Sequence, residues 1–348
     1  MTSAKVAFQQ RGQKQDAAVF DYEREVRQVW RDFPRIKNKV YFLELGAEAI
    51  SPVYPGNPRI KEALGQFFKK QHELWAEAQY LREEQKSSGY QSYDDNNLGI
   101  VCLYTGEDRF PLLAASASLT QELTFSFDHE LGHAIVPDGV LSDYTHLKEC
   151  IADAYATIRH LQRAGAGSSV IDAVVEKRAL QFIFQKTEGD YFTSPVTEKI
   201  LARRHEIDWN SLTPQETTRL ARRFALEYAL HPRDLQVLDK SFHKFHGKLN
   251  ALRKGNVTLL RDLAEKVLST DTPDVFKWGA VVLNAALKGH FRRPPYSIIL
   301  SGDYWDAVRQ KLAEKQKIFA AQGEIMFGLV SPDRSLQRRS SPAKIMAR

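Results

Sequence analysis

The pattern His129-Glu130-Leu131-Gly132-His133 constrains this chain more than any other stretch of its sequence. It lies in a segment whose apolar residues recur at every fourth position, which predicts an amphipathic helix. These apolar residues are Leu119, Leu123, Phe127, Leu131 and Ile135. Side chains four apart on a helix differ by about 400° of rotation, so both imidazoles project from one face, one turn apart. The apolar residues lie roughly 200° around the helix from His129. The pattern therefore predicts a helix that binds one metal ion with two histidines and packs through its opposite face.

The ends of this segment and the residue between its histidines agree with that interpretation. Ser118 and Gln121 can form a capping box at the start, and Pro137 fits a helix stop. Glu130 lies about 100° around the helix from His129, where it can reach a metal-bound water without binding the metal itself. A similar stretch, His72-Glu73-Leu74-Trp75-Ala76, lacks the second histidine and is interpreted as the solvated edge of a helix.

A third metal ligand is expected, because catalytic zinc normally has three protein ligands and one open position for water. A second amphipathic helix is predicted from residues at helical spacing, namely Leu147, Ile151, Ala154, Ile158 and Leu161. Glu149 and Asp153 lie together on its opposite face. One carboxylate can bind the metal while the other accepts the free N–H of a ligating imidazole. His146 and Asp153 are alternatives to Glu149 as the third ligand, and a solvated helix face is the alternative explanation of the acidic pair.

The two motifs together resemble the thermolysin-type zinc metallopeptidases, the gluzincins. The resemblance covers residues 118–163 and depends on His129-Glu130-x-x-His133 followed by Glu149-x-x-x-Asp153. It implies that Glu149 is the third zinc ligand and that Asp153 supports a histidine. It also implies an α+β fold, with a zincin-like N-terminal half that carries a small sheet and a mostly helical C-terminal half. Lys148 and Ala152 stand where the family usually has Asn and Ser. The metzincin pattern is absent, because Gly139 occupies the position where it requires a third histidine.

Composition limits the broad class of the protein. A chain of 348 residues with 43% hydrophobic and 26% charged residues can bury a sizeable core. Cys102 and Cys150 are too few for a disulfide framework and lack zinc-ribbon spacing, which suits a reducing compartment. The first thirty residues hold no apolar run of signal-peptide length, so we expect a cytoplasmic protein with signal-independent export left open. No run is long enough for a membrane span, and the net charge of +6 is too modest to indicate nucleic-acid binding.

The N-terminal half is predicted to alternate helices and strands. Residues 1–15 are interpreted as a flexible arm and 16–163 as the zincin-like metal-binding region. A helix is expected up to Phe33, followed by a strand over Val40–Leu45, a loop over 52–58, and one long helix from Pro58 to Leu81. Residues 87–97 are interpreted as a polar break before two strands, 98–104 and 110–118. By resemblance, the second strand lines the cleft, and its residues 114–118 can pair with an extended peptide or form an ordinary core strand.

The C-terminal half is predicted to be a helical domain over 164–330, with a helix over 170–186, a turn-rich loop over 187–195, and a basic disordered tail over 331–348. Arg334 to Arg348 carries five positive charges and no acid, which also resembles the export signals of some bacterial type IV secretion substrates. Stabilisation of a tetrahedral oxyanion requires at least one further hydrogen-bond donor near the metal. The candidate donors are Tyr191, Tyr155, His205 and His231. His160 lies too far along its helix to bind the metal, so a surface or supporting role is expected.

These observations predict a zinc-dependent metallopeptidase that acts on peptide or protein substrates. Zinc would be bound by His129, His133 and Glu149, Glu130 would act as the general base, and Tyr191 and His205 are the preferred oxyanion donors. The alternative is a non-hydrolytic zincin-fold protein with a binding, regulatory or secreted-effector role. The sequence does not determine the oligomeric state.

Overall fold

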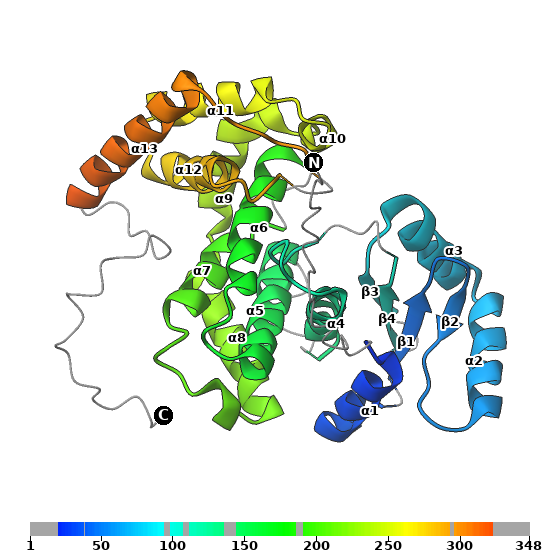
Figure 1. The fold of residues 1–348 in the computed structure, drawn as a ribbon. Coiled ribbons are helices and arrows are strands. Elements are labelled where there is room, and N and C mark those ends of the chain that lie inside the picture. Colours follow the sequence, from blue (N-terminus) through cyan, green and yellow to red (C-terminus); the bar gives the residue numbers. More distant parts are fainter. Residues whose placement is uncertain are drawn as a thin grey trace, which may run out of the picture.

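The computed structural model describes residues 20–37, 39–93, 98–106, 111–135, 144–185, 191–292 and 296–322. The predicted N-terminal arm, the basic tail and the stop at Pro137 lie outside these residues. The fold is α+β: Figure 1 shows a small sheet at one side, helices at the other, and α4 (Leu119–Ile135) between them. None of the described helices is long and apolar enough to cross a bilayer.

Four strands form a mixed sheet in the order β2-β1-β4-β3. Their bounds are Val40–Leu45 for β1, Ile50–Pro52 for β2, Gly89–Tyr93 for β3 and Leu98–Tyr104 for β4. β1 and β4 run parallel, from the pair Val40 and Gly99 to the pair Leu45 and Tyr104, and both outer pairings are antiparallel. The strands predicted at 40–45 and 98–104 are confirmed. The two central strands are apolar on both faces because helices cover both faces.

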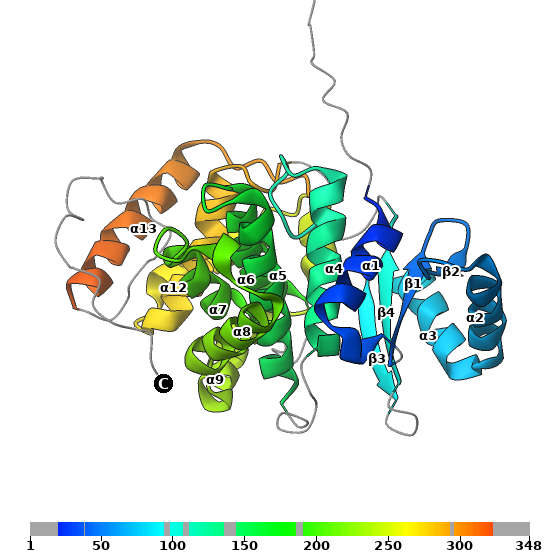
Figure 2. The same cartoon turned by 90° about the horizontal axis from the view of Figure 1, so that it is seen from below.

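The two faces of the sheet pack against different helices. Figure 2 shows α1 (Tyr22–Asp32) and α4 along one face, and α2 (Pro58–Lys70) and α3 (His72–Tyr80) along the other. Successive strand residues point to opposite faces. Phe42 and Val101 therefore belong to the cluster that includes α4, whereas Leu43 and Cys102 pack with α3. This alternation places α4 directly against the sheet.

The predicted long helix over 58–81 is interrupted. Gln71 has φ −88° and ψ 85°, which ends α2, and α3 continues into a π-helical turn over Leu81–Gln85. His72 and Glu73 are exposed, so the interpretation of this stretch as a solvated helix edge is confirmed.

The strand predicted at 110–118 is wrong. Residues 111–118 form a loop, because the buried carboxylate of Glu122 accepts the backbone N–H groups of Leu112 and Leu113 at 3.0 and 2.9 Å. Lys177 donates to the carbonyl of Leu113. These side chains satisfy the backbone groups that a sheet would otherwise pair. The edge strand beside α4 is instead β3, in the stretch predicted to be a polar break.

The C-terminal part of the described chain is helical. Its helices are α5 (Thr145–Ala164), α6 (Ala173–Phe184), α7 (Ser194–Ala202), α8 (Pro214–Tyr228), α9 (Pro232–Phe242), α10 (Leu249–Arg253), α11 (Thr258–Ser269), α12 (Pro273–Leu287) and α13 (Asp303–Ala321). Short 3₁₀ turns lie at Pro34–Ile36, Val170–Asp172, Trp209–Ser211 and His243–Phe245. Prolines occupy the first turn of α8, α9 and α12, where a missing N–H costs nothing. One hydrophobic cluster continues from α1 to α13, so the two regions share a core.

Helices α4 and α5 approach each other closely at Gly132. A Cβ atom on Gly132 would lie 2.8 Å from the backbone Cα of Ala152 and 3.4 Å from its Cβ. Asp128 on α4 adds an ion pair with Arg163 on α5, and Arg159 lies 3.9 Å from the same carboxylate. Only small residues at the crossing point permit this spacing.

The variant Gly132→Ala should therefore destabilise the protein, although Ala has a helix propensity about 1 kcal/mol better than Gly. Forcing the helices apart should lower the free energy of unfolding by about 1–3 kcal/mol, measured from the denaturant midpoint at constant m value. Gly167→Ala is the matched control, because a Cβ there meets no atom within 4 Å. Equal midpoints for the two variants would show that the crossing tolerates a methyl group.

Candidate metal centre

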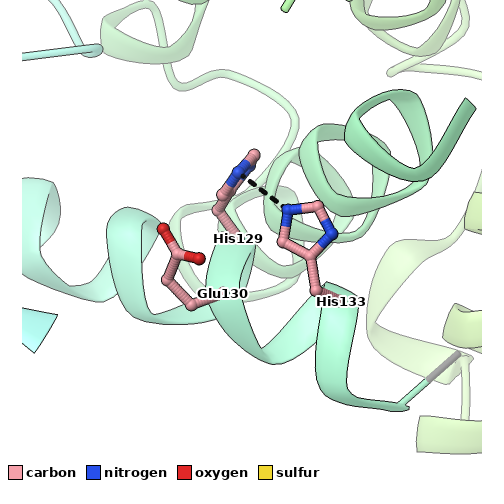
Figure 3. Close-up of side chains that lie close together, drawn as sticks. All are labelled: His129, Glu130 and His133. Carbon is pink, nitrogen blue, oxygen red and sulfur yellow. Dashed lines mark hydrogen bonds between the residues drawn. The ribbon is translucent and has the colours of Figure 1, made fainter. Parts of the chain in front are cut away.

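The two histidines of α4 form the base of a candidate metal centre. The helix begins with a capping box, in which the Ser118 N–H donates to Gln121 Oε1 at 2.9 Å and the Gln121 N–H donates to Ser118 Oγ at 3.2 Å. His129 and His133 project from one face, with their Nε2 atoms 3.3 Å apart (Figure 3). His129, Glu130 and His133 offer ligand atoms that lie within 4.8 Å of one another.

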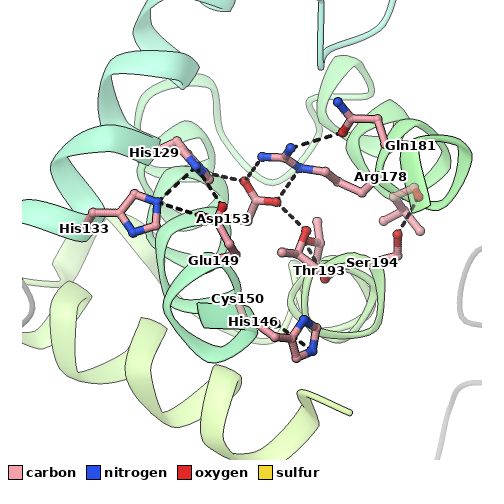
Figure 4. A network of polar contacts seen from close by, with 12 residues as sticks. His129, His133, His146, Glu149, Cys150, Asp153, Arg178, Gln181, Thr193 and Ser194 are labelled. Carbon is pink, nitrogen blue, oxygen red and sulfur yellow. Dashed lines mark hydrogen bonds and ion pairs between the residues drawn. The ribbon is translucent and has the colours of Figure 1, made fainter. Parts of the chain in front are cut away.

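The carboxylate of Glu149 on α5 meets both imidazoles. Its Oε2 lies 3.4 Å from Nε2 of His129, and its Oε1 lies 3.4 Å from Nε2 of His133 (Figure 4). Nitrogen and oxygen ligands at about 2.0–2.1 Å from a tetrahedral zinc are separated by about 3.3–3.4 Å. Oε2 is also buried without a hydrogen-bond partner among the described residues. The donor set, its spacing and this unsatisfied oxygen all fit a zinc ion.

The electrostatics of the group favour ionised Glu149. Burial alone would raise the pKa of this carboxyl, but the neighbouring charges of His133 and His129 outweigh burial and lower the pKa far below its usual range. A carboxylate that stays ionised is the form that binds a metal.

Asp153 lies one helical turn beyond Glu149 and contacts the Nδ1 side of the His129 ring. Its Oδ1 lies 2.7 Å from Nδ1 of His129. Because a carboxylate accepts, Nδ1 carries the proton and Nε2 is directed toward His133 and Glu149. Burial works to lower the pKa of His129, but the charge and hydrogen bond of Asp153 raise it to about 10. The contact therefore both orients the ring and makes it a stronger base.

Asp153 is itself surrounded by donors from the helical half. Nε and Nη2 of Arg178 lie 2.7 and 2.8 Å from its oxygens, and Thr193 donates its hydroxyl to Oδ2. Nη1 of Arg178 donates to Gln181 at 3.1 Å. Burial opposes ionisation of Asp153, but Arg178 and His129 hold its pKa far below the usual range. The sequence analysis missed Arg178, Thr193 and Gln181. Arg178 could have been suspected from the sequence because it is a charged residue within an apolar helix. Fully buried charges are almost always paired, so such a residue implies a partner.

Glu130 lies beside the histidines but differs from Glu149 in its surroundings. It is buried on α4, and Figure 3 shows its carboxylate on the same side of the helix as the His129 ring. Burial, the largest influence, raises its pKa, although the neighbouring His129 and His133 oppose this. A carboxyl whose pKa is moved toward neutrality is suited to accept and release a proton.

A cavity of about 910 Å³ opens next to these side chains. It is lined by the predicted ligands, by Glu130, and by residues from β3, α6 and α10. The ring of Tyr90 on β3 stacks on His133, with centroids 6.2 Å apart and an interplanar angle of 9°. Tyr191 also lines the cavity and is 39% exposed, with the Arg178 guanidinium 5.8 Å from its ring centroid. Tyr191 is therefore near enough to the site to remain a candidate donor.

The other proposed oxyanion donors lie elsewhere. His205 is exposed in the turn after α7, and His231 is the exposed N-cap of α9, where Nδ1 accepts the N–H of Arg233. Tyr155 is buried in the hydrophobic core. None of these three residues lines the cavity, because each lies either in the core or on the outer surface.

The alternative ligand His146 is also separate from the group. It is fully buried on another face of α5, where its Nε2 lies 3.6 Å from Cys150 Sγ and its ring contacts Tyr144. His160 makes a 2.9 Å hydrogen bond with Ser168, and burial lowers its pKa to about 4. His160 is buried and is not among the residues that line the cavity.

The Arg178→Met variant should be strongly destabilised, because it leaves the Asp153 carboxylate buried without its charge partner. Removal of one partner of a buried ion pair costs about 3–5 kcal/mol of unfolding free energy, measurable from the denaturant midpoint. Arg223→Met is the control, because its ion pair with Glu227 is exposed and contributes little. A similar small change in both variants would mean that Asp153 does not depend on Arg178.

Comparison with protein-family models, with curated proteins and with solved structures finds no match to this chain. The candidate metal centre is therefore characterised by its own geometry, in which two imidazoles and a carboxylate from two helices converge beside a second carboxylate and a large cavity.

Proposed function

We propose that this protein is a zinc-dependent metallopeptidase, in which His129, His133 and Glu149 bind the metal. The observation that carries the proposal is the convergence of their side chains: the two imidazole Nε2 atoms lie 3.3 Å apart, and each lies 3.4 Å from one carboxylate oxygen of Glu149, spacings that suit ligands of one metal ion. The adjoining cavity leaves room for water and for a peptide chain. Three protein ligands with an open side are typical of catalytic zinc.

The proposed mechanism assigns a separate task to each carboxylate. Zinc at this site would lower the pKa of water from 15.7 toward about 7 and polarise the substrate carbonyl. Glu130 takes the proton of the attacking water and transfers it to the departing amine, which its raised pKa favours. Asp153 keeps the His129 ring oriented, and Tyr191 is the candidate donor to the developing oxyanion.

A non-hydrolytic binding protein is the alternative function. Structural zinc sites usually have four protein ligands and are closed to solvent. The group described here has three suitable ligands, a buried carboxylate at the position of a base, and a cavity beside it. This combination supports hydrolysis over a purely structural metal.

Purified protein should contain close to one zinc ion per chain, measured by elemental mass spectrometry. The variants His129→Ala and His133→Ala should lose it, because each removes one of three ligands. Glu149→Ala should weaken zinc binding far more than His146→Ala, although the fully buried His146 leaves a cavity when truncated. Circular dichroism of each variant controls for unfolding. Absence of zinc from the wild type would contradict the metal assignment, and a greater loss in His146→Ala would reassign the third ligand.

Glu130→Gln should retain zinc but lose hydrolysis of an unstructured protein such as casein. Removal of a general base typically lowers the rate by about 10²–10⁴-fold, because no group then accepts the proton of the attacking water. Glu227→Gln, on the exposed surface of α8, should remain fully active, and a chelator should abolish activity of both the wild type and this control. A Glu130→Gln protein with wild-type activity would show that the base is another residue.

A further inference from the structure

The two proposed histidine ligands differ in how their rings are held. Nδ1 of His129 lies 2.7 Å from the carboxylate of Asp153, which fixes the orientation of that ring. His133 contacts His129 and Glu149 through its Nε2, but its Nδ1 makes no hydrogen bond with any of the described residues (Figure 4). The direction of Nε2 in His133 therefore depends on other contacts of the ring, which select among its rotamers.

Tyr90 on the edge strand β3 supplies such a contact. The centroids of the Tyr90 and His133 rings lie 6.2 Å apart, and the two ring planes are almost parallel, at 9°. Aromatic rings in offset stacks prefer centroid separations of about 4.5–7 Å. Because a turn of the His133 ring would lose this contact between the two faces, the stack restricts the rotation of that ring.

The pleat of the sheet places Tyr90 on the side of α4. Tyr90 pairs with Val101 on β4, and directly paired residues share one face of a sheet. Val101 belongs to the hydrophobic cluster that includes α4, and Tyr90 packs against the same cluster. Gly99 lies two residues before Val101 and so on this face as well, and a Cβ there would lie 2.8 Å from the Tyr90 hydroxyl oxygen and 3.0 Å from its Cε2. Gly99 therefore leaves the space that the Tyr90 ring occupies beside His133.

Resting on the proposed metal binding, we propose that Tyr90 is a positioning residue for His133 and that strand β3 thereby regulates the affinity of the site for zinc. The stacked ring does for His133 what the Asp153 carboxylate does for His129, because it favours the rotamer that directs Nε2 toward the metal. A ligand that is already oriented loses less conformational freedom on binding. Since β3 is an edge strand and the proposed ligands belong to α4 and α5, a shift of β3 would change zinc affinity without moving the backbone of a ligand.

Zinc affinity tests this inference separately from hydrolysis. Wild-type protein and variants are stripped of metal and titrated with zinc in competition with a chromophoric chelator. Tyr90→Leu keeps an apolar side chain but loses the aromatic face, so its dissociation constant for zinc should rise about 3–10-fold. Tyr90→Phe keeps the stacked ring and should bind zinc as wild type does. Tyr80→Leu is the matched control, because Tyr80 is 48% exposed and does not line the cavity.

A second variant displaces the ring without removing it. The methyl group of Gly99→Ala would press on the far end of the Tyr90 side chain and should move its ring off His133, which should also weaken zinc binding. In a Tyr90→Leu background Gly99→Ala should then have no further effect on zinc affinity, whereas independent effects would add. Denaturant midpoints of all variants control for a general loss of stability. Wild-type zinc affinity in Tyr90→Leu, or full additivity in the double variant, would overturn the proposal.

The ring contact can also be measured in metal-free protein, so this proposal and the metallopeptidase assignment fail in different ways. The ring current of Tyr90 changes the chemical shifts of the His133 ring protons, whose NMR signals are assigned by their absence in His133→Ala. These signals should move in Tyr90→Leu and stay in place in Tyr80→Leu. Unmoved signals in Tyr90→Leu would overturn the positioning role even if wild-type protein binds zinc and cleaves peptides. If the signals move but wild-type protein binds no zinc, the positioning of the ring is supported and the metal assignment fails.

Discussion

The close crossing of α4 and α5 at Gly132 is the constraint on which the candidate metal centre depends. A residue with a Cβ at this point would press on the backbone of Ala152, which lies between Glu149 and Asp153 in the sequence. The contact therefore sets how far the two carboxylates lie from the histidines of the facing helix. Separations of 3.3 and 3.4 Å between donor atoms leave little tolerance, since a shift of 1 Å would remove one ligand from a tetrahedral arrangement with bonds of about 2.0–2.1 Å. The packing of small residues between α4 and α5 therefore determines whether the proposed coordination geometry can form.

Electrostatic balance is the second requirement, because the centre collects several charges away from solvent. Asp153 is fully buried and faces His129 on one side and Arg178 on the other. Burial opposes the ionised form of Asp153, and the two partners together outweigh burial. Helix α6 thus contributes to the candidate metal centre without supplying a proposed ligand, because it carries the arginine that keeps the carboxylate of Asp153 charged. For Glu130 the balance is reversed, because burial raises its pKa more than the neighbouring His129 and His133 lower it.

The features that could be predicted from the sequence are those determined by local spacing. The helical face of His129 and His133, the pairing of Glu149 with Asp153, the strands 40–45 and 98–104 and the start of α4 all follow from periodicity and capping. The prediction failed where residues far away in the sequence determine the local structure. Residues 111–118 become a loop because Glu122 and Lys177 bind their backbone groups, and β3 becomes an edge strand because β4 is available to pair with a polar segment. Arg178 belongs to the site only because the tertiary fold brings its guanidinium from α6 to within 2.7 Å of Asp153 on α5, and His205 is excluded because it lies exposed in the turn after α7.

The same division separates the candidate metal centre from the walls of the cavity beside it. The proposed metal ligands and the proposed general base come from two consecutive helices, so one short stretch of sequence can specify them. The walls of the cavity come from β3, α3, α5 and α10, which are far apart in the sequence and come together only in the folded chain. A change in α10 would therefore alter the lining of the cavity without touching the proposed metal ligands. The part of the lining that α10 supplies can therefore differ between related chains while the arrangement of the two histidines and Glu149 is kept.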